Sequence, residues 1–351
     1  MTKYYTRACN FYYGSLSKEL VKNKKTFPLC GNKEISFDKI EIFSKNKKKI
    51  SSKLIDINKI NLLPKLIKAK VFSDIVKITS KRKFLNKKSH ILMGVLNITP
   101  DSFSDGGKFN TNKKALKRIK EMTSSGADII DIGGESTRPG SKIISPKVEW
   151  KRVKDTIKKF KKNFPKTLLS IDTRKSLVMK NSIKYKADII NDVSCFKFDT
   201  DSSKTIKNKN LWKIIHHMKG TPQTMQIKPK YHHVLLDIYD FFENEIIKME
   251  KQRYKKIILD PGIGFGKNLK HNLMILNKIS IFHSLGFPIL IGTSRKRFIN
   301  QISKNFDSKE RLGGTLSSVL FLLSQGVQIF RIHNVKEIKQ GILVFEILLN
   351  R

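Results

Sequence analysis

The sequence predicts an α/β protein: a (β/α)8 TIM barrel over residues 88–351, preceded by a small N-terminal α+β extension over residues 1–87. Two observations predict the barrel. From about residue 88 onward, eight short apolar runs end in polar or Gly-rich residues, and an amphipathic stretch follows each run. The repeat fills roughly 260 residues, the usual size of such a barrel. An open doubly wound sheet is the structural alternative, since alternation alone does not show closure, but the number eight favours the barrel.

The eight runs are rich in Ile and Leu and are bounded by turn residues, which is typical of parallel strands buried on both faces. They are ILMGVL (91–96), DIIDIGG (128–134), TLLSIDT (167–173), DIINDVS (188–194), KIIHHM (213–218), KIILDPG (256–262), PILIGTS (288–294) and QIFRIHNV (328–335).

Amphipathic stretches between the runs predict helices. In one of them, Ser145 is expected to cap the helix and Pro146 to occupy its first turn, where proline is tolerated. The predicted helices span 112–125, 146–162, 175–186, 232–253, 269–285, 308–325 and 335–350.

Residues 1–87 contain aromatic and aliphatic residues such as Phe11, Tyr12, Phe37 and Ile40, which argue against a disordered tail. This segment carries no catalytic signature. We expect it to fold as a small appendage against the barrel, and its role stays open between an oligomer contact and packing on the barrel bottom.

The net charge of +42 has two interpretations. A Lys-rich surface is typical of proteins that bind nucleic acids through phosphates. Alternatively, the base composition of an A/T-rich genome favours Lys codons at surface positions where the residue type has little effect. Because the lysines are spread along the chain rather than gathered in one motif with aromatics, we favour codon bias and expect no specific nucleic-acid partner.

No apolar run approaches the ~18 residues of a membrane helix, and the N-terminus does not resemble a secretion signal. Cys9, Cys30 and Cys195 are odd in number and scattered, so neither a disulfide framework nor a zinc site is indicated. We therefore expect a cytoplasmic protein without a membrane partner.

The stretch GVLNITPDSFSDGG (94–107) changes abruptly from a buried strand to a polar loop. The same change recurs at the other strands, and active sites of barrels form at these carboxyl ends. The polar residues at the eight ends include Asn97 and Asp101, GGESTRPGS (133–141), Asp172, Asn191 and Asp192, His217 to Gly220, Asp260, Ser294 to Lys296, and Arg331 with His333.

These side chains sort by chemistry. Hydrogen-bond acceptors and one amide, from Asp172, Asn191 and Asp260, suit a flat heterocycle in a dry pocket. Asn97 and Asp101 offer the hard oxygens that Mg²⁺ prefers. The cationic groups of Arg138, Lys296, Arg331 and His333 suit a diphosphate. The residues thus predict a polar aromatic substrate that carries a diphosphate, with Mg²⁺ assisting its departure.

Each residue alone has a structural interpretation. Asp260 before Pro261 and Gly262 is also typical of a turn, and Asp172 before Thr173 of a helix cap. The joint pattern is the stronger signal.

The motifs closely resemble those of the dihydropteroate synthase family, in the family's order and over nearly all of the chain from about residue 90. One departure is Lys219, where the family more often has Gln. The matching motifs are MGVLNITPDSFSDGG (93–107), GADIIDIGGESTRPGS (126–141), SIDTRK (170–175), IINDVS (189–194), HMKGTPQTMQ (217–226), ILDPGIGFGK (258–267), GTSRK (292–296) and RIHNV (331–335).

The resemblance implies a folate-pathway transferase, a target of sulfonamides. It would join 6-hydroxymethyl-7,8-dihydropterin diphosphate to p-aminobenzoate, giving 7,8-dihydropteroate and pyrophosphate. The family commonly forms homodimers through helices late in the barrel, which implies the same here.

The resemblance also implies a role for each matching residue. Mg²⁺ would be the cofactor, bound by Asn97, and the catalytic residues would be Asp101, Asp172 and Lys296. The pterin would contact Asp172, Asn191, Met218, Asp260 and Lys296; the diphosphate Asn97, Arg138, Arg331 and His333; and p-aminobenzoate Phe103, Thr137, Pro139 and Ser294.

A related pterin-binding barrel that transfers a methyl group to a corrinoid protein is the main functional alternative. It shares the Asp and Asn pattern but has no need of TPDSFSDGG, GGESTRPGS or the SRK and RIH cationic motifs.

Overall fold

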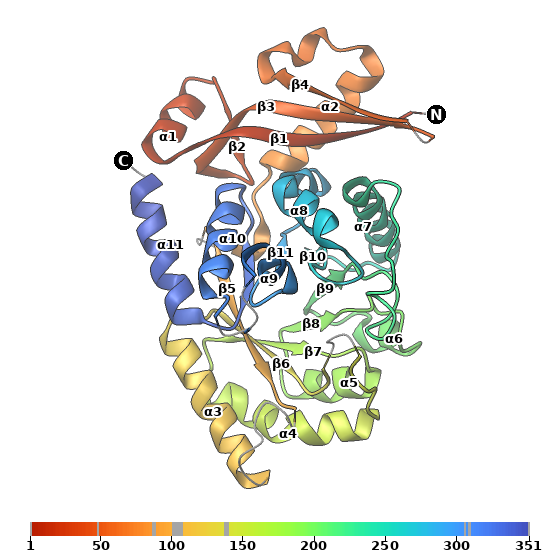
Figure 1. The fold of residues 1–351 in the computed structure, drawn as a ribbon, viewed down its shortest axis with the longest axis vertical. Helices are drawn as coiled ribbons and strands as arrows, with labels where there is room; N and C mark the ends of the chain where they lie inside the picture. The colour runs from red at the N-terminus through yellow and green to blue at the C-terminus, as the bar shows by residue number, and fades with distance from the viewer. Residues whose placement is uncertain are drawn as a thin grey trace.

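The computed structural model describes residues 2–47, 49–85, 89–99, 108–136, 140–304, 307 and 310–349. They form two packed parts, an antiparallel sheet with its helices and a parallel barrel, which lie at the top and in the body of Figure 1. Within the described part of the chain, none of the helices has the length and apolar character needed to span a membrane.

The barrel is built from eight parallel strands in the order β10-β9-β8-β7-β6-β5-β12-β11. A single bridge between Leu259 and Ile289 brings β10 beside the start of β11, so the sheet is nearly closed. This confirms the predicted TIM barrel. The strands are β5 (Ile91–Asn97), β6 (Ile129–Gly133), β7 (Leu168–Asp172), β8 (Ile189–Asp192), β9 (Trp212–His216), β10 (Ile257–Asp260), β11 (Leu290–Ile291) and β12 (Ile329–Ile332).

Helices surround the barrel strands (Figure 1). The Ser145 hydroxyl accepts a hydrogen bond from the Val148 N–H, and Pro146 begins the helix, as predicted. The helical elements are α3 (Lys108–Ser124), α4 (Pro146–Asn163), α5 (Ser176–Lys184), α6 (Ser202–Ile206), α7 (Val234–Lys251), α8 (Leu269–Asn277), the 3₁₀ helix η4 (Ile279–Leu285), α9 (Arg297–Ser303), α10 (Leu312–Ser324) and α11 (Val335–Leu349).

One predicted helix was wrong in its extent. The stretch 269–285 is not continuous, because α8 ends at Asn277 and η4 begins at Ile279. Every residue of η4 is buried. Its Ser280 hydroxyl donates to the Ala8 carbonyl, so packing against the extension accompanies the tighter 3₁₀ geometry.

The extension forms a separate four-stranded antiparallel sheet with the path β1-β3-β2, and β4 pairs with β3. Its side chains contribute to two cores. Phe37 and Ile40 pack with α2, whereas Tyr5 and Phe43 join the core of the barrel. Its elements are β1 (Lys3–Tyr13), α1 (Gly14–Lys22), β2 (Phe27–Leu29), β3 (Asn32–Asn46), β4 (Lys49–Asp56), the 3₁₀ helix η1 (Ile57–Leu62), α2 (Lys65–Thr79) and the 3₁₀ helix η2 (Lys83–Leu85).

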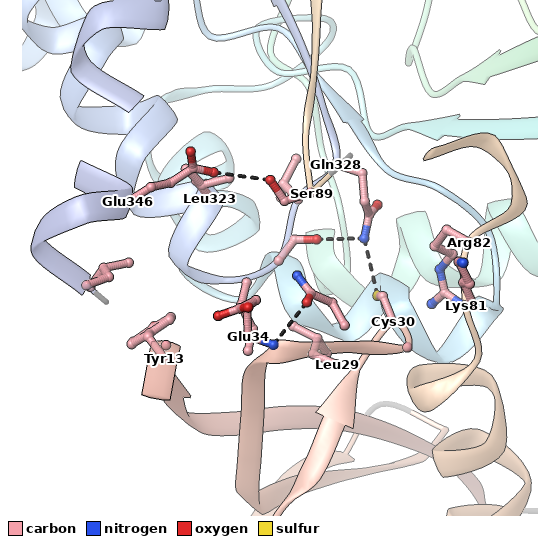
Figure 2. Close-up of a pocket in the computed structure, with 17 residues that line it drawn as sticks. Tyr13, Leu29, Cys30, Glu34, Lys81, Arg82, Ser89, Leu323, Gln328 and Glu346 are labelled. Carbon is pink, nitrogen blue, oxygen red and sulfur yellow. Dashed lines mark hydrogen bonds between the residues drawn. The ribbon is translucent and has the colours of Figure 1, made fainter. Parts of the chain in front are cut away.

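Polar contacts fix the extension to the barrel end where the strands begin. The Tyr13 hydroxyl donates to the Ser324 carbonyl, and Arg82, itself buried, donates to the His283 carbonyl. Gln328, directly before β12, points toward Cys30 and donates to its thiol (Figure 2). A cavity of about 580 Å³ lies along this contact. The predicted boundary between residues 87 and 88 stays a prediction, but the extension does lie at the end of the barrel opposite to the carboxyl ends of the strands.

Candidate active site

The barrel interior has an apolar half and a polar half. Side chains point inward at every second position of a strand. Near the strand starts these positions hold one apolar cluster, and two residues further along they become polar, as in Ile129 to Asp131, Ile189 to Asn191 and Ile329 to Arg331. The apolar cluster comprises Phe84, Ile91, Met93, Ile129, Ile189, Ile214, Ile258, Leu290 and Ile329. The alternation therefore raises the polar groups toward the carboxyl end of the barrel.

A network of ion pairs and hydrogen bonds connects four strands, β6, β7, β8 and β12, in the polar half. Arg331 donates from Nε to Asp131 Oδ2 at 2.7 Å and from Nη2 to Asp172 Oδ2 at 2.8 Å. Asp131 also accepts from the Ser170 hydroxyl at 2.6 Å and from Asn191 Nδ2 at 3.1 Å. The network fixes the orientations of Asp172, Asn191 and Arg331 together.

Two groups of this network have unused capacity for a ligand. Burial raises the pKa of Asp172 to about 7, although Arg331 opposes the shift. Asn191 is buried, and its Oδ1 atom has no hydrogen-bond partner among the described residues. A buried acceptor without a donor is costly. Asn191 Oδ1 is therefore suited to a ligand N–H.

Asp260 stands at the end of β10. Its Oδ1 atom accepts from the Gly262 N–H at 2.8 Å, which is the turn interaction considered from the sequence. Its Oδ2 atom lies 3.8 Å from His216 Nε2 inside the barrel. Burial raises the pKa of Asp260 to about 6, and burial lowers the pKa of His216 well below its usual value. Asp260 thus has both a turn role and a place in the site.

Lys296 follows the short strand β11. Its amine lies 4.2 Å from the centre of the Phe265 ring, and the methylene groups pass over Gly264, where a Cβ atom would be 3.4 Å from Lys296 Cδ. Lys296 forms no ion pair with any described carboxylate. Burial and the nearby Arg331 charge lower the pKa of Lys296 to about 8. This amine is therefore available to donate to an anionic or polar ligand.

Ser294 and His333 meet at the same end, from segments after β11 and β12. The Ser294 hydroxyl lies 3.0 Å from His333 Nδ1 and accepts from the His333 N–H at 3.2 Å. Met218 follows β9 and is half-buried. The departure at Lys219 is accommodated nearby, where its amine donates to the Lys230 carbonyl and lies 4.6 Å from the centre of the Tyr231 ring.

The position of Asn97 fits a magnesium ion. Asn97, Gly133 and Asp172 are neighbours across β5, β6 and β7. A Cβ atom added to Gly133 would lie 3.4 Å from Asp172 Cβ and 3.5 Å from Asn97 Oδ1, so glycine leaves the space between them free. The described residues contain no group of three or more His, Cys, Asp or Glu side chains suited to a metal. A hard amide oxygen beside open space fits Mg²⁺, which keeps several water or phosphate ligands.

A second buried network lies beneath the loop that follows β6. Glu135 accepts from Arg174 at 3.0 Å and from Lys175 at 2.9 Å, and Lys175 also pairs with Glu149 at 2.7 Å. Glu135 further accepts from the Ile144 N–H, which fixes the position of Ile144 just before α4. This network was not foreseen, although Arg174 and Lys175 lie in the SIDTRK motif.

The structure therefore brings together most of the predicted residues that it describes. Asp172, Asn191 and Arg331 are joined through Asp131, a residue that the sequence analysis did not select. Its signal in the sequence is a lone carboxylate inside an otherwise apolar strand. Five predicted site residues lie outside the described residues: Asp101, Phe103, Thr137, Arg138 and Pro139.

Comparisons with known proteins agree with this geometry. Residues 93–333 match the model of the family described as pterin binding enzyme. The chain is 40% identical to the dihydropteroate synthase of Escherichia coli strain K12 over 261 residues, which cover 74% of this chain and 92% of the relative.

Solved structures extend the similarity to three dimensions. A dihydropteroate synthase of Yersinia pestis in a sulfonamide drug complex is 37% identical with a TM-score of 0.67, covering 74% of this chain and 93% of that one. A dihydropteroate synthase of Xanthomonas albilineans with 4-aminobenzoic acid is 30% identical with a TM-score of 0.69 at the same coverage of both chains. The family match begins at residue 93, after the extension.

Proposed function

We infer the chemistry of the site from one premise: the chain belongs to the pterin-binding enzyme family, as a dihydropteroate synthase. It is a transferase of folate biosynthesis that joins 6-hydroxymethyl-7,8-dihydropterin diphosphate to p-aminobenzoate and releases pyrophosphate. The observation that carries this conclusion is the convergence of Asp172, Asn191, Asp260 and Lys296 on one end of a barrel that matches the family from residue 93 to 333.

The pterin is proposed to bind in the polar half of the barrel. Asp172, Asp260 and the free Oδ1 atom of Asn191 would accept hydrogen bonds from its amino and amide N–H groups. Lys296 would donate to an acceptor on the opposite edge, and Met218 would pack on the ring face. Hydrogen bonds hold Asp172, Asn191 and Asp260 in place before the substrate arrives, which lowers the entropic cost of binding.

The diphosphate would lie toward β12 and β5. Arg331 and His333 supply the charge and donors for it, and Arg138 is expected to join them. Asn97 is proposed to hold Mg²⁺ beside the open space over Gly133. When bound, the ion neutralises charge on the leaving diphosphate.

Catalysis then rests on charge stabilisation rather than on a strong base. The arylamine nucleophile is neutral at pH 7, so the difficult step is ionisation of the carbon–oxygen bond. Arg331 and His333 stabilise the departing anion, while the Asp172 carboxylate stabilises the positive charge that develops on the pterin. Ser294, Phe103, Thr137 and Pro139 are proposed to frame p-aminobenzoate. Asp101 is proposed to act catalytically from the loop after β5.

A homodimer is proposed to form through α10 and α11. These two helices pack closely, since a Cβ atom on Gly341 would lie 2.4 Å from Leu316 Cδ1. Their outer side exposes Phe321, Leu343, Val344, Ile347 and Leu348, which are between 47% and 66% exposed. A patch of this kind marks an interface. Ile347→Glu is expected to shift the mass measured by light scattering from dimer to monomer.

A cytoplasmic location is also proposed. Cys9, Cys30 and Cys195 are all free thiols and all buried, which fits a reducing compartment.

A coupled assay with dihydropterin diphosphate and p-aminobenzoate tests the function. Dihydropteroate should form, its rate should fall when Mg²⁺ is removed, and a sulfonamide should compete with p-aminobenzoate. Methyl transfer from methyltetrahydrofolate to a corrinoid, without dihydropteroate formation, would contradict the assignment.

A further inference from the structure

Lys267 is a buried amine to which the mechanism above gives no task. It is 2% exposed and stands at the end of the loop 261–267, between β10 and α8. It forms no ion pair with a described carboxylate, and burial lowers the pKa of its amine well below the usual value. A buried cation without a counterion is costly, and apolar replacements of buried charges are often neutral or stabilising. Stability alone therefore gives no reason for a lysine here.

The contacts of Lys267 join two loops at the carboxyl end of the barrel. Its amine lies 3.0 Å from His217 Nδ1 and donates to the His217 carbonyl at 3.2 Å and to the Phe265 carbonyl at 2.9 Å. His217 directly precedes Met218, the proposed pterin contact. Phe265 carries the ring beneath Lys296, and the same ring packs edge-on against His216, which faces Asp260.

The two loops approach backbone to backbone, which only glycine permits. A Cβ atom on Gly262 would lie 2.0 Å from the His217 carbonyl oxygen, and one on Gly266 would lie 2.5 Å from the Lys219 carbonyl oxygen. Both glycines have positive φ angles, +67° and +64°. The glycines allow this approach, and the Lys267 amine bonds to both loops from within. It does so beside the Gln226 amide and the Tyr231 hydroxyl, which also join the two loops.

We propose that Lys267 is a positioning residue for pterin binding: by joining the His217 and Phe265 carbonyls it sets Met218 against the ring face and the Phe265 ring beneath Lys296. This proposal rests on the proposed pterin site. It assigns Lys267 no contact with substrate and no proton transfer.

Lys213, near the start of β9, is a matched control in the same chain. Lys213 is also 2% exposed, and its amine also donates to two carbonyls, those of Lys209 and Leu211, at 3.0 Å each. It lies away from the carboxyl ends of the strands. The same substitution at the two positions therefore separates the loss of a buried amine from the loss of pterin positioning.

The test compares Lys267→Met with Lys213→Met in steady-state kinetics and thermal unfolding. We expect Lys267→Met to raise KM for dihydropterin diphosphate roughly 10- to 100-fold, equivalent to about 1.4–2.7 kcal/mol of binding free energy. KM for p-aminobenzoate should stay within about twofold. Lys213→Met should leave both constants unchanged. Lys267→Gln, which keeps a donor for one carbonyl, should fall between Lys267→Met and the wild type.

Several outcomes would overturn the proposal. One is wild-type kinetics in Lys267→Met. Another is an equal rise of both KM values, which would indicate general disorder. If neither Lys267 variant folds while Lys213→Met does, the amine is a requirement of the fold and the proposal is also wrong. A wild-type chain that makes no dihydropteroate would instead contradict the proposed function.

Discussion

The two ends of the barrel both bury polar side chains, but they use them differently. At the end where the strands begin, His283 and Gln328 sit under the extension, and their hydrogen bonds go to the Gln325 carbonyl and to the Cys30 thiol. At the carboxyl end, Lys296 has no ion pair and Asn191 Oδ1 has no donor among the described residues. His283 and Gln328 are bonded within the protein, whereas Lys296 and Asn191 Oδ1 are left for the substrate.

This difference predicts which substitutions harm activity and which harm stability. Incomplete pairing at the carboxyl end costs folding free energy and is retained for binding. At the other end, hydrogen bonds within the protein hold the extension in place. Substitutions at the carboxyl end should therefore reduce turnover in a folded protein. Substitutions at the end where the strands begin should reduce stability with turnover unchanged.

The largest effect is expected from Asp172→Asn and Lys296→Ala. Each removes a charge that is proposed to contact the reacting pterin, so kcat should fall by roughly 10²- to 10³-fold. Thermal unfolding of Lys296→Ala should be little changed, since Lys296 has no carboxylate partner to lose. Asp172→Asn should unfold at a lower temperature, because it also weakens the pair with Arg331. Lys270→Ala, at an exposed lysine in α8, is the control. Full turnover in either active-site variant would refute the site.

The second-largest effect is expected at the end of the barrel where the strands begin. Gly326 has φ +77°, and a Cβ atom there would lie 2.3 Å from Leu29 Cδ2 across the contact with the extension. Gly326→Ala should lower the free energy of unfolding by about 1–3 kcal/mol while kcat of the folded protein stays the same. Gly313→Ala, in α10 with no atom within 4 Å of the added Cβ, should not destabilise. A fall in kcat for Gly326→Ala would mean that the two ends are coupled.

The pH dependence sharpens the comparison further. Burial raises the pKa of Asp172 to about 7, so its carboxylate is lost as the pH falls through 7. Burial lowers the pKa of Lys296 to about 8, so its charge is lost as the pH rises through 8. The profile of kcat/KM should therefore peak between these values. In Lys296→Arg the falling limb should disappear from the remaining activity, because guanidinium stays charged; an unchanged limb would assign it to another group.

The smallest effect is expected at the rim of the extension. Lys3 pairs with Asp240 at 2.6 Å and with Glu243 at 2.5 Å, but the three side chains are 39%, 26% and 35% exposed. Exposed pairs contribute little, so Lys3→Ala should cost less than about 1 kcal/mol in a urea titration. A larger loss would show that these pairs anchor the extension.

The sequence predicted the local features and the chemistry of the strand ends. The structure confirms the predicted positions of Ser145 and Pro146 at the start of α4. They could be predicted because a helix start depends on adjacent residues. The ion pair between Asp131 and Arg331 could not be predicted from adjacent residues. The two are 200 residues apart and meet only when the barrel closes. The break after α8 was missed for a similar reason, since η4 is set by packing against the extension. Glu135 and Glu149 likewise meet Lys175 only in three dimensions.

The most direct test is a crystal structure of the chain with 6-hydroxymethyl-7,8-dihydropterin diphosphate. We predict the pterin ring in the polar half of the barrel, within hydrogen-bond distance of Asp260 and Asn191 Oδ1, with its diphosphate toward Arg331. A ring bound elsewhere, for example in the cavity beneath the extension (Figure 2), would contradict the account.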